Sequence, residues 1–308
     1  MESDMVKVRV PASSANLGPG FDCIGVALNL YTEISMGFTK EGLFIEVYGE
    51  GASDIEKDEN NLVFKAAKKV WEEIGADFKG LKIEIHNGIP LGSGLGSSAA
   101  AIVGGMVAAN ELAGGILSQE EILNLAASME GHADNVAPAL NGGLNITVFD
   151  GKTVYYIKKE LEEELKFIAF TPKKILKTEI ARKVLPEKID FKDAVFNTGR
   201  SSLLVAALFS DRYDLLKIAS QDMLHQKYRS KLIPEMYSCF DKALEAGAYS
   251  VFLSGAGPTI MAIASIDNAK KVAKEVATVY ERDNIDYKIY ELRCENNGAQ
   301  VIKASLPI

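Results

Sequence analysis

The residues with the clearest chemical meaning form a glycine- and serine-rich segment, PLGSGLGSSAA, at residues 90–100. Its three glycines are Gly92, Gly94 and Gly96, and two of its serines, Ser97 and Ser98, follow them directly. Glycine takes left-handed conformations and lets a ligand approach the backbone closely. The serines should open a helix, whose free N–H groups and dipole attract an anion. The segment therefore predicts a phosphate-binding loop.

Alternative interpretations of this loop can be weighed from its spacing. A lone Gly-x-Gly would more often be a simple turn capped by a serine, but this pattern is longer. It lacks the lysine of a Walker A loop and the acidic residue about 20 positions later that a dinucleotide site needs. A serine hydrolase using Ser97 or Ser98 would need a strained Gly-x-Ser-x-Gly elbow, which is not present.

Residues 90–100 closely resemble the phosphate loop of the GHMP kinase superfamily. Two further blocks, PASSANLGPGFDCIGVALNLY at 11–31 and EGHADNVAPALNGG at 130–143, are similar to the homoserine kinases in particular. SGAGPT at 254–259 resembles the C-terminal glycine motif of the superfamily. The resemblance extends along most of the chain, from the first expected strand to this last motif.

This resemblance implies an α+β fold of two domains, with an N-terminal ribosomal-S5-like domain at residues 1–163 and a C-terminal ferredoxin-like domain at 164–308. The active site would lie between them. The implied activity is transfer of the γ-phosphate of ATP to the hydroxyl of L-homoserine, giving O-phospho-L-homoserine for threonine biosynthesis. Other acceptors, namely mevalonate, shikimate or a sugar, remain alternatives. A non-catalytic ligand-binding paralogue is a further alternative. Such a protein should lack the serines of the loop or the glutamate expected to bind the metal, and this sequence has Ser97, Ser98 and Glu130.

The resemblance also assigns nucleotide and metal residues. Those expected at the nucleotide are Asn61, Pro90, Leu91, Gly92, Ser93, Gly94, Leu95, Gly96, Ser97, Ser98, Ala99, Gly255 and Gly257. Asn61 would lie near the adenine, but it could equally be a helix N-cap. Ser98 and Glu130 would bind Mg²⁺, which prefers oxygen ligands.

Homoserine is a zwitterion, so its site needs cations for the carboxylate and acceptors for the ammonium group. The residues that the resemblance places there are Asn16, Asp22, His132, Asn135, Thr178, Arg182 and Arg229. Arg182 and Arg229 would bind the carboxylate, and Asp22 the ammonium group. Thr178 should share a helix face with Arg182, four residues later. Asp134 could orient a neighbour or cap a helix.

Catalytic roles fall by resemblance to Asn135, Ser98 and Glu130. Relatives similar to mevalonate kinase carry an aspartate where this sequence has Asn135, and an amide is not a useful proton acceptor at neutral pH. We therefore expect no strong general base, with the γ-phosphate or water taking the proton.

The elements that must position these residues can be read from periodicity. We expect strands at 6–10, 26–34, 43–48 and 83–85, helices at 62–74, from Ser97 and at 119–129, and a hairpin of 144–149 with 153–157. Pro11 should end the first strand, and residues 11–25 should form a loop. A charged boundary at 158–166 precedes strands at 167–171, 249–253 and 260–264, helices within 178–247 and at 268–282, and a final strand pair, in a split β-α-β order.

Composition limits the partners. The chain has 308 residues, 47% of them hydrophobic, and a net charge of −8, which is typical of a globular enzyme and argues against nucleic-acid binding. The apolar run at 99–109 is too short to span a membrane, and the three cysteines show no paired spacing. Because the first residues do not resemble a secretion signal, we expect a cytoplasmic protein, and family precedent makes a homodimer plausible.

Overall fold

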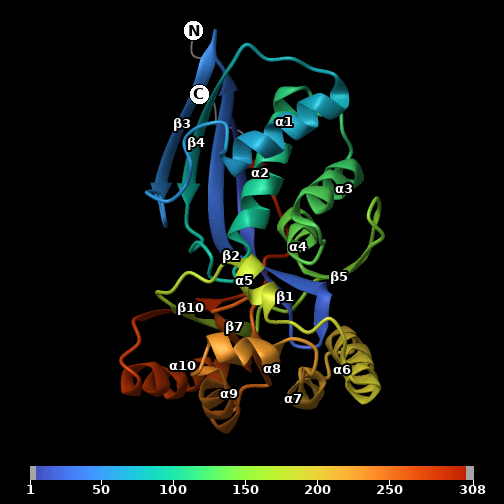
Figure 1. The fold of residues 1–308 in the computed structure, drawn as a ribbon, viewed down its shortest axis with the longest axis vertical. Helices are drawn as coiled ribbons and strands as arrows, with labels where there is room; N and C mark the ends of the chain where they lie inside the picture. The colour runs from blue at the N-terminus through green and yellow to red at the C-terminus, as the bar shows by residue number, and fades with distance from the viewer. Residues whose placement is uncertain (1–4, 303–308) are drawn as a thin grey trace.

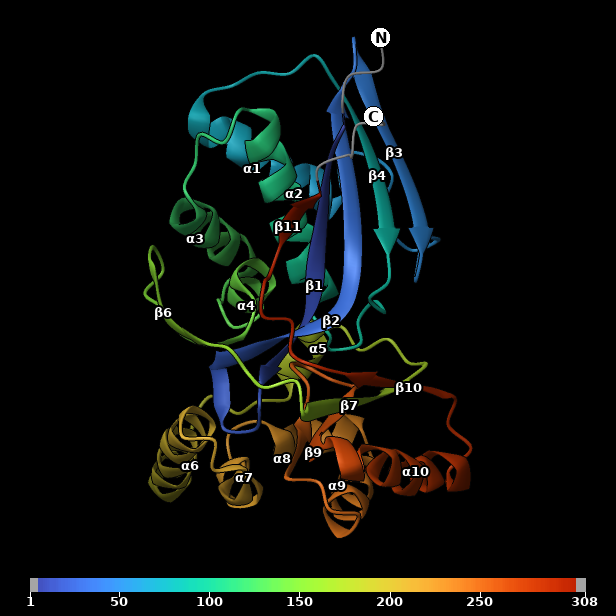
Figure 2. The same ribbon diagram turned by 180° about the vertical axis from the view of Figure 1, so that it is seen from behind.

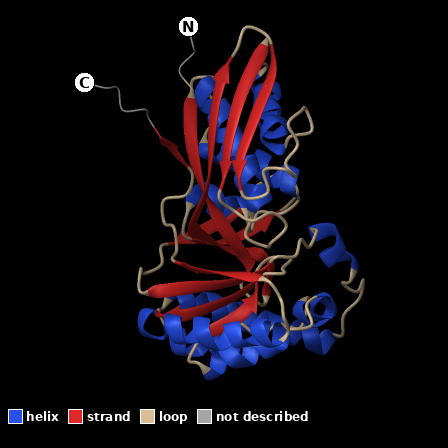
Figure 3. Cartoon of the chain, turned by 90° about the vertical axis from the view of Figure 1, so that its left-hand side faces the viewer, coloured by secondary structure: helices blue, strands red, loops and turns tan. Residues whose placement is uncertain are grey.

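The computed structural model describes residues 5–302, which form two β-sheets, each with helices packed on it (Figures 1 and 3). The first sheet has seven strands. Its main path is β11 (Gln300–Ile302), β1 (Val6–Asn16), β2 (Gly20–Phe38), β4 (Gly80–Asn87) and β3 (Gly42–Gly49), with β5 (Leu144–Phe149) and β6 (Val154–Lys159) branching from β2. Only β3 and β4 run parallel in this sheet of the described residues, so the sheet is mixed.

Helix α2 (Ser97–Leu112) packs directly on β1 and β2, and three further helices surround it: α1 (Leu62–Ile74), α3 (Gln119–Glu130) and α4 (Val136–Asn141). Its apolar sequence suits this buried position. A Cβ at Gly104 would stand 2.5 Å from the Ile34 side chain, so glycine permits the close contact between helix and sheet. The buried helix expected from Ser97 is confirmed.

Local signals predicted α1 and α3 correctly, whereas the short helix α4 was not expected. Asn61 caps α1 by accepting hydrogen bonds from the backbone N–H groups of Val63 and Phe64, and Gly75 ends the helix in a left-handed conformation. Ser118 and Glu121 form the capping box at the start of α3.

The expected loop at 11–25 is wrong, because most of it is strand. β1 continues past Pro11 to Asn16, and β2 begins at Gly20. A register shift between Pro11 and Ala12 accommodates the proline, which has no N–H to donate to the ladder. Only a short turn remains, and Asn16 and Leu17 reach it with positive φ angles of 74° and 46°.

The second sheet has four strands in the order β10 (Tyr287–Leu292), β7 (Leu165–Pro172), β9 (Ile260–Ser265) and β8 (Ser250–Leu253). Helices α9 (Met236–Glu245) and α10 (Ile266–Arg282) pack on it. The other helical segments are α5 (Thr178–Lys183), α6 (Phe191–Phe209), η1 (Tyr213–Leu215), α7 (Leu216–Ala219), α8 (Gln226–Arg229) and η2 (Ser230–Leu232). The chain order follows the split β-α-β layout that was expected.

The two last strands do not form a pair with each other. β10 pairs with β7, whereas β11 crosses to the first sheet and pairs antiparallel with β1, with Val301 opposite Val8 (Figure 2). The guanidinium of Arg9 donates to the side-chain oxygen of Gln300 at 3.0 Å. The division predicted between residues 163 and 164 falls in the connection from β6 to β7.

Among residues 5–302, no helix combines the length and the apolar character needed to cross a bilayer. The three cysteines are free thiols, as their spacing predicted.

Candidate active site

The glycine loop and the SGAGPT motif lie against each other at the junction of the two sheets. Ser254 donates a hydrogen bond from its hydroxyl to the carbonyl of Gly94 at 2.6 Å. The backbone N–H of Thr259 donates to the carbonyl of Ser93 at 3.0 Å. These bonds join two segments 160 residues apart, so the two sheets meet at the predicted phosphate loop.

Gly94 shows how closely the motifs approach. Its φ angle is +87°, and an added Cβ would stand 2.2 Å from the carbonyl oxygen of Ser254. We expect Gly94→Ala to lower the thermal midpoint and raise the KM for ATP at least several-fold, because both the conformation and the contact exclude a side chain. Unfolding and steady-state kinetics would check this.

The matched control is Gly114→Ala. Gly114 has a similar φ of +90°, but an added Cβ there would meet no atom within 4 Å. This variant should carry the conformational strain alone and leave the KM for ATP unchanged. Equal effects of both substitutions would contradict the importance of the contact between the motifs.

The loop leads directly into the N-terminus of α2. Gly96 is the N-cap residue with a φ of 70°, and no side chain caps the helix, so its first N–H groups are available for an anion. Ser93 is used within the loop, since its hydroxyl donates to the carbonyl of Pro90. Leu95 and Ala99 are fully buried and support the loop from behind. In the predicted phosphate loop, Gly92 and Ser98 are therefore exposed, whereas Ser93, Leu95 and Ala99 are buried and hold the loop in place.

The two predicted metal residues meet. Ser98, in the first turn of α2, donates from its hydroxyl to a carboxylate oxygen of Glu130 at 2.9 Å, and Glu130 is the last residue of α3. A hydroxyl and a carboxylate beside a phosphate loop are oxygen donors of the kind that Mg²⁺ prefers, so the residues fit this ion.

A cavity of about 310 Å³ extends from the loop toward α1. Asn61, Leu62, Ile55 and Leu91 are among the residues that line it. The Asn61 side-chain oxygen serves as the N-cap of α1, and its amide nitrogen donates to the carbonyl of Glu56 at 2.6 Å. The capping role of Asn61 is therefore confirmed, and its contact with the adenine stays a prediction.

On the other side of the loop, Asp22 and Arg182 form a bidentate ion pair. The two Nη atoms of Arg182 donate to the two carboxylate oxygens of Asp22 at 3.0 and 2.8 Å. The hydrogen bond to Asp22 is the main cause that raises the pKa of Arg182. The sequence analysis assigned Asp22 to the ammonium group of the substrate and Arg182 to its carboxylate. In the structure the two side chains pair with each other.

Arg229 is almost fully buried, with 2% of its surface exposed. Its Nη1 donates to the carbonyl of Gly255 at 2.8 Å, and its Nε donates to the carbonyl of Ala181 at 3.2 Å. Burial, followed by the charge of Arg182, lowers its pKa to about 10. The guanidinium remains a cation at neutral pH and links α8, α5 and the SGAGPT motif.

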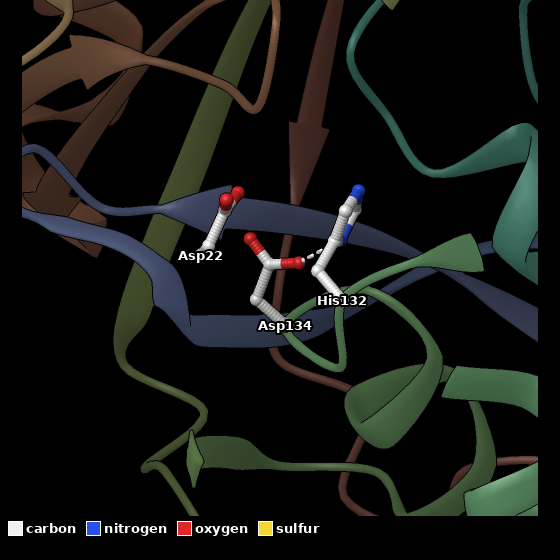
Figure 4. A group of neighbouring side chains, drawn as sticks. All are labelled: Asp22, His132 and Asp134. Carbon is white, nitrogen blue, oxygen red and sulfur yellow. Dashed lines mark hydrogen bonds and ion pairs between the residues drawn. The ribbon is translucent and has the colours of Figure 1, made fainter. Parts of the chain in front are cut away.

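An acidic cluster lies beside this pair. Asp22, His132 and Asp134 each offer a ligand atom within 4.8 Å of the others, and Figure 4 shows the two carboxylates and the imidazole gathered in one space. His132 Nδ1 lies 2.5 Å from Asp134 Oδ1. Burial lowers the pKa of His132, but the hydrogen bond to Asp134 and nearby carboxylates outweigh it, so the pKa is raised. Such a cluster suits a ligand ammonium group.

Asp134 orients its neighbours. It is 1% exposed, and its carboxylate accepts from His132 and from the side-chain amide of Asn135, at 3.4 Å in the latter case. Ser13 donates from its hydroxyl to the Asn135 oxygen at 2.9 Å. Of the two roles considered for Asp134, the geometry supports orientation of a neighbour.

The small space between these groups, about 100 Å³, is lined by residues from both sides. They include Ser98, Glu130, His132, Asn135, Thr178 and Gly255. Asn16 lies at the edge of this region, where its amide donates to the carbonyl of Gly255 at 3.0 Å. This volume therefore brings together predicted phosphate, metal and acceptor residues, whereas Asp22, Arg182 and Arg229 are not among the residues that line it.

Sequence reasoning missed four contributors: Ser13, Ser14, Phe21 and His225. The two serines and Phe21 belong to the matched block at 11–31, which was the signal that could have found them. Ser14 exchanges a hydrogen bond with Ser254 at 2.7 Å. His225 had no such signal.

His225 is a fully buried histidine that ties the turn after β1 to Arg229. Its Nε2 lies 2.8 Å from the carbonyl of Gly18, and its Nδ1 lies 3.2 Å from Nη1 of Arg229. Arginine only donates, so Nδ1 accepts and Nε2 carries the proton. Burial lowers the pKa of His225 below the usual 6.5, with Arg229 adding to this and Asp222 and Asp22 opposing it.

Because His225 is buried and neutral, the folded protein should lose stability as the pH falls. The unfolded chain takes up a proton on His225 near pH 6.5, whereas the folded chain resists it. The stability due to neutral His225 is therefore full above that pH and is lost as pH falls, by up to about 1.4 kcal/mol per pH unit.

Denaturant unfolding of the wild type and of His225→Gln between pH 8 and 5 would measure this loss. The variant should lack that part of the slope. His86→Gln, at an exposed position of β4, is the control and should retain it. Parallel slopes for the wild type and His225→Gln would contradict the buried neutral histidine.

Comparisons with known proteins agree with this geometry. The chain matches the family model "GHMP kinases N terminal domain" over residues 61–143 and "GHMP kinases C terminal" over residues 204–282. It is 65% identical over 303 residues to the homoserine kinase of Caldanaerobacter subterraneus, covering 98% of this chain and 97% of that protein. It is 50% identical over 300 residues to the homoserine kinase of Caldicellulosiruptor bescii, covering 96% and 97%.

Among solved structures, the crystal structure of homoserine kinase from Cytophaga hutchinsonii superimposes with a TM-score of 0.89. The two are 32% identical, and the match covers 97% of this chain and 98% of that one. The expected two-domain α+β fold is confirmed.

Proposed function

Because this chain belongs to the GHMP kinase family, and is similar to homoserine kinases along nearly its whole length, we propose that it transfers the γ-phosphate of ATP to the side-chain hydroxyl of L-homoserine. The product is O-phospho-L-homoserine, and the reaction is a step of threonine biosynthesis. The observation that carries the proposal is the small volume lined by the glycine loop, the Ser98–Glu130 pair and His132, with Asp22 and its partner Arg182 next to that histidine.

Phosphoryl transfer requires mainly positioning and neutralisation of charge on the phosphate oxygens. The backbone N–H groups of the loop and of the first turn of α2 would hold the phosphates. Ser98 and Glu130 would hold Mg²⁺, which supplies positive charge to the phosphate oxygens when bound. The cavity beside Asn61 and Leu62 would take the adenosine part of ATP.

The acceptor would lie on the opposite side of the volume. Its carboxylate would approach Arg182 and Arg229. Its ammonium group would take the place of Arg182 as the hydrogen-bond donor to the Asp22 carboxylate. Asn16, which accepts a hydrogen bond from the Asp22 N–H, would support this contact. Thr178, four residues before Arg182 on α5, would contact the carboxylate. His132 and Asn135 would donate or accept hydrogen bonds at the reacting hydroxyl.

Asn135 would orient that hydroxyl without removing its proton, because an amide is not a base at neutral pH. Its orientation is supported by Ser13 and Asp134. The proton would then pass to the γ-phosphate or to water. Catalysis would rest on alignment of the hydroxyl with the phosphate.

A coupled assay of ADP release with Mg·ATP tests the proposal. L-Homoserine would be compared with L-threonine, L-serine, mevalonate, shikimate and galactose at equal concentrations. A large rate with L-homoserine alone is the expected result. Turnover of another alcohol would discard the assigned acceptor residues, and silence with all would favour the binding paralogue. Glu130→Gln protein, purified in the same way, controls for contaminating kinases.

A homodimeric assembly and a cytoplasmic location remain predictions from the family. Sedimentation of the purified chain would test the first.

A further inference from the structure

The Phe21 ring contacts both arginines of the proposed acceptor site. The Cζ atom of Arg182 lies 5.5 Å from the centre of the ring, and that of Arg229 lies 5.3 Å from it. The ring also packs at 5.2 Å, with a tilt of 36°, against the imidazole of His225. One phenylalanine therefore touches two cations from different helices and the histidine that accepts a hydrogen bond from one of them.

Two guanidinium groups near each other repel. After burial, the charge of Arg182 is the largest cause that lowers the pKa of Arg229, which places the two within electrostatic reach. Arg182 is held by Asp22, and Arg229 by the carbonyls of Gly255 and Ala181. The carboxylates of Asp22, Asp222 and Asp134 offset part of the repulsion, because each raises the pKa of Arg229, but the net pKa is still lowered.

The face of an aromatic ring attracts a cation within about 6 Å, and both guanidinium groups satisfy that distance to the same ring. The ring is also fixed in position. Phe21 lies between Gly20 and Asp22 at the start of β2, where Asp22 has a φ of +57° and its N–H donates to the Asn16 side chain. The ring and the Asp22 carboxylate therefore reach the arginines from adjacent positions of one constrained turn.

Building on the proposed function, we propose that Phe21 is a positioning residue for the carboxylate of the acceptor, because its ring is a shared cation–π surface that holds Arg182 and Arg229 together. A carboxylate that bridges two guanidinium groups needs both at once. Loss of the ring would let them move apart and would weaken acceptor binding, while the nucleotide side would be unaffected.

The test replaces Phe21 by 4-fluoro-, 3,5-difluoro- and 3,4,5-trifluorophenylalanine. Fluorine withdraws charge from the ring face and changes its shape little. The KM for L-homoserine should rise step by step with the number of fluorine atoms, and two ordinary cation–π contacts together amount to roughly tenfold. The kcat and the KM for ATP should stay constant. Phe21→Tyr should behave as the wild type, and Phe21→Leu should be at least as impaired as the trifluoro protein.

A second readout does not depend on the acceptor. The unfolding midpoint of the same proteins should fall in the order of fluorination, because the ring's attraction for the arginines acts in the free protein as well. The unfolding measurement can therefore contradict the role of Phe21 without contradicting the proposed function. The proposed function is tested separately by the assay of the wild-type protein.

A KM for homoserine and an unfolding midpoint that do not change along the series would overturn the inference and leave Phe21 as ordinary packing. A parallel rise in the KM for ATP would also overturn it, since it would indicate a general distortion of the site.

Discussion

Replacement of Glu130 by Gln is expected to lower kcat by at least about 100-fold while the protein folds normally. Glu130 ends α3, and its carboxylate accepts a hydrogen bond from Ser98 of the predicted phosphate loop. Glutamine has nearly the same shape but offers a neutral oxygen, which is a much weaker Mg²⁺ ligand than a carboxylate. Steady-state kinetics over a range of Mg²⁺ concentrations would measure the loss, and added Mg²⁺ should restore part of it.

Glu120→Gln is the matched control. It removes the same charge from the same helix, at an exposed position in the first turn of α3. Its kcat should equal that of the wild type. If Glu130→Gln were as active as this control, the metal role of Glu130 would have to be abandoned.

Replacement of Arg182 by Ala is expected to raise the KM for L-homoserine by roughly 10- to 100-fold and to change the KM for ATP little. A hydrogen bond to a charged group contributes about 1.5–3 kcal/mol. This substitution removes the donors that Arg182 directs at Asp22 and that it would direct at the carboxylate of the proposed acceptor. The expected effect stays at the scale of one charged contact because Arg182 is partly exposed. Initial rates with each substrate varied in turn would give both constants.

Arg182→Lys separates charge from geometry. Lysine keeps the positive charge but lacks the planar fork that matches a carboxylate, so its KM should fall between those of the wild type and Arg182→Ala. An equal rise in both KM values for Arg182→Ala would remove Arg182 from the acceptor site.

Features set by local rules could be predicted from the sequence. The start of α2 at Ser97, the capping box of α3 and the end of α1 at Gly75 each depend on residues within one or two turns. The predicted phosphate loop could also be recognised, since its three glycines lie within five consecutive residues, 92–96. Family resemblance then placed Ser98 and Glu130 together, and their hydrogen bond agrees with this.

Features set by distant residues were missed. The segment at 11–25 has the composition of a loop, but β1 and β2 pair along it, and this tertiary pairing outweighs local propensity. The pairing of Asp22 with Arg182 joins residues 160 positions apart. The roles of Phe21 and His225 depend on side chains from α5, α8 and the turn after β1, which no spacing in the sequence indicates.

The crossing of β11 to the first sheet also governs the order in which this chain can mature on the ribosome. Arg9 emerges early, but its partner Gln300 is synthesised 291 residues later. Until then the outer edge of β1 has its N–H and C=O groups unpaired, and an open edge invites pairing with other nascent chains. The first sheet can therefore be completed only after every strand of the second has been synthesised.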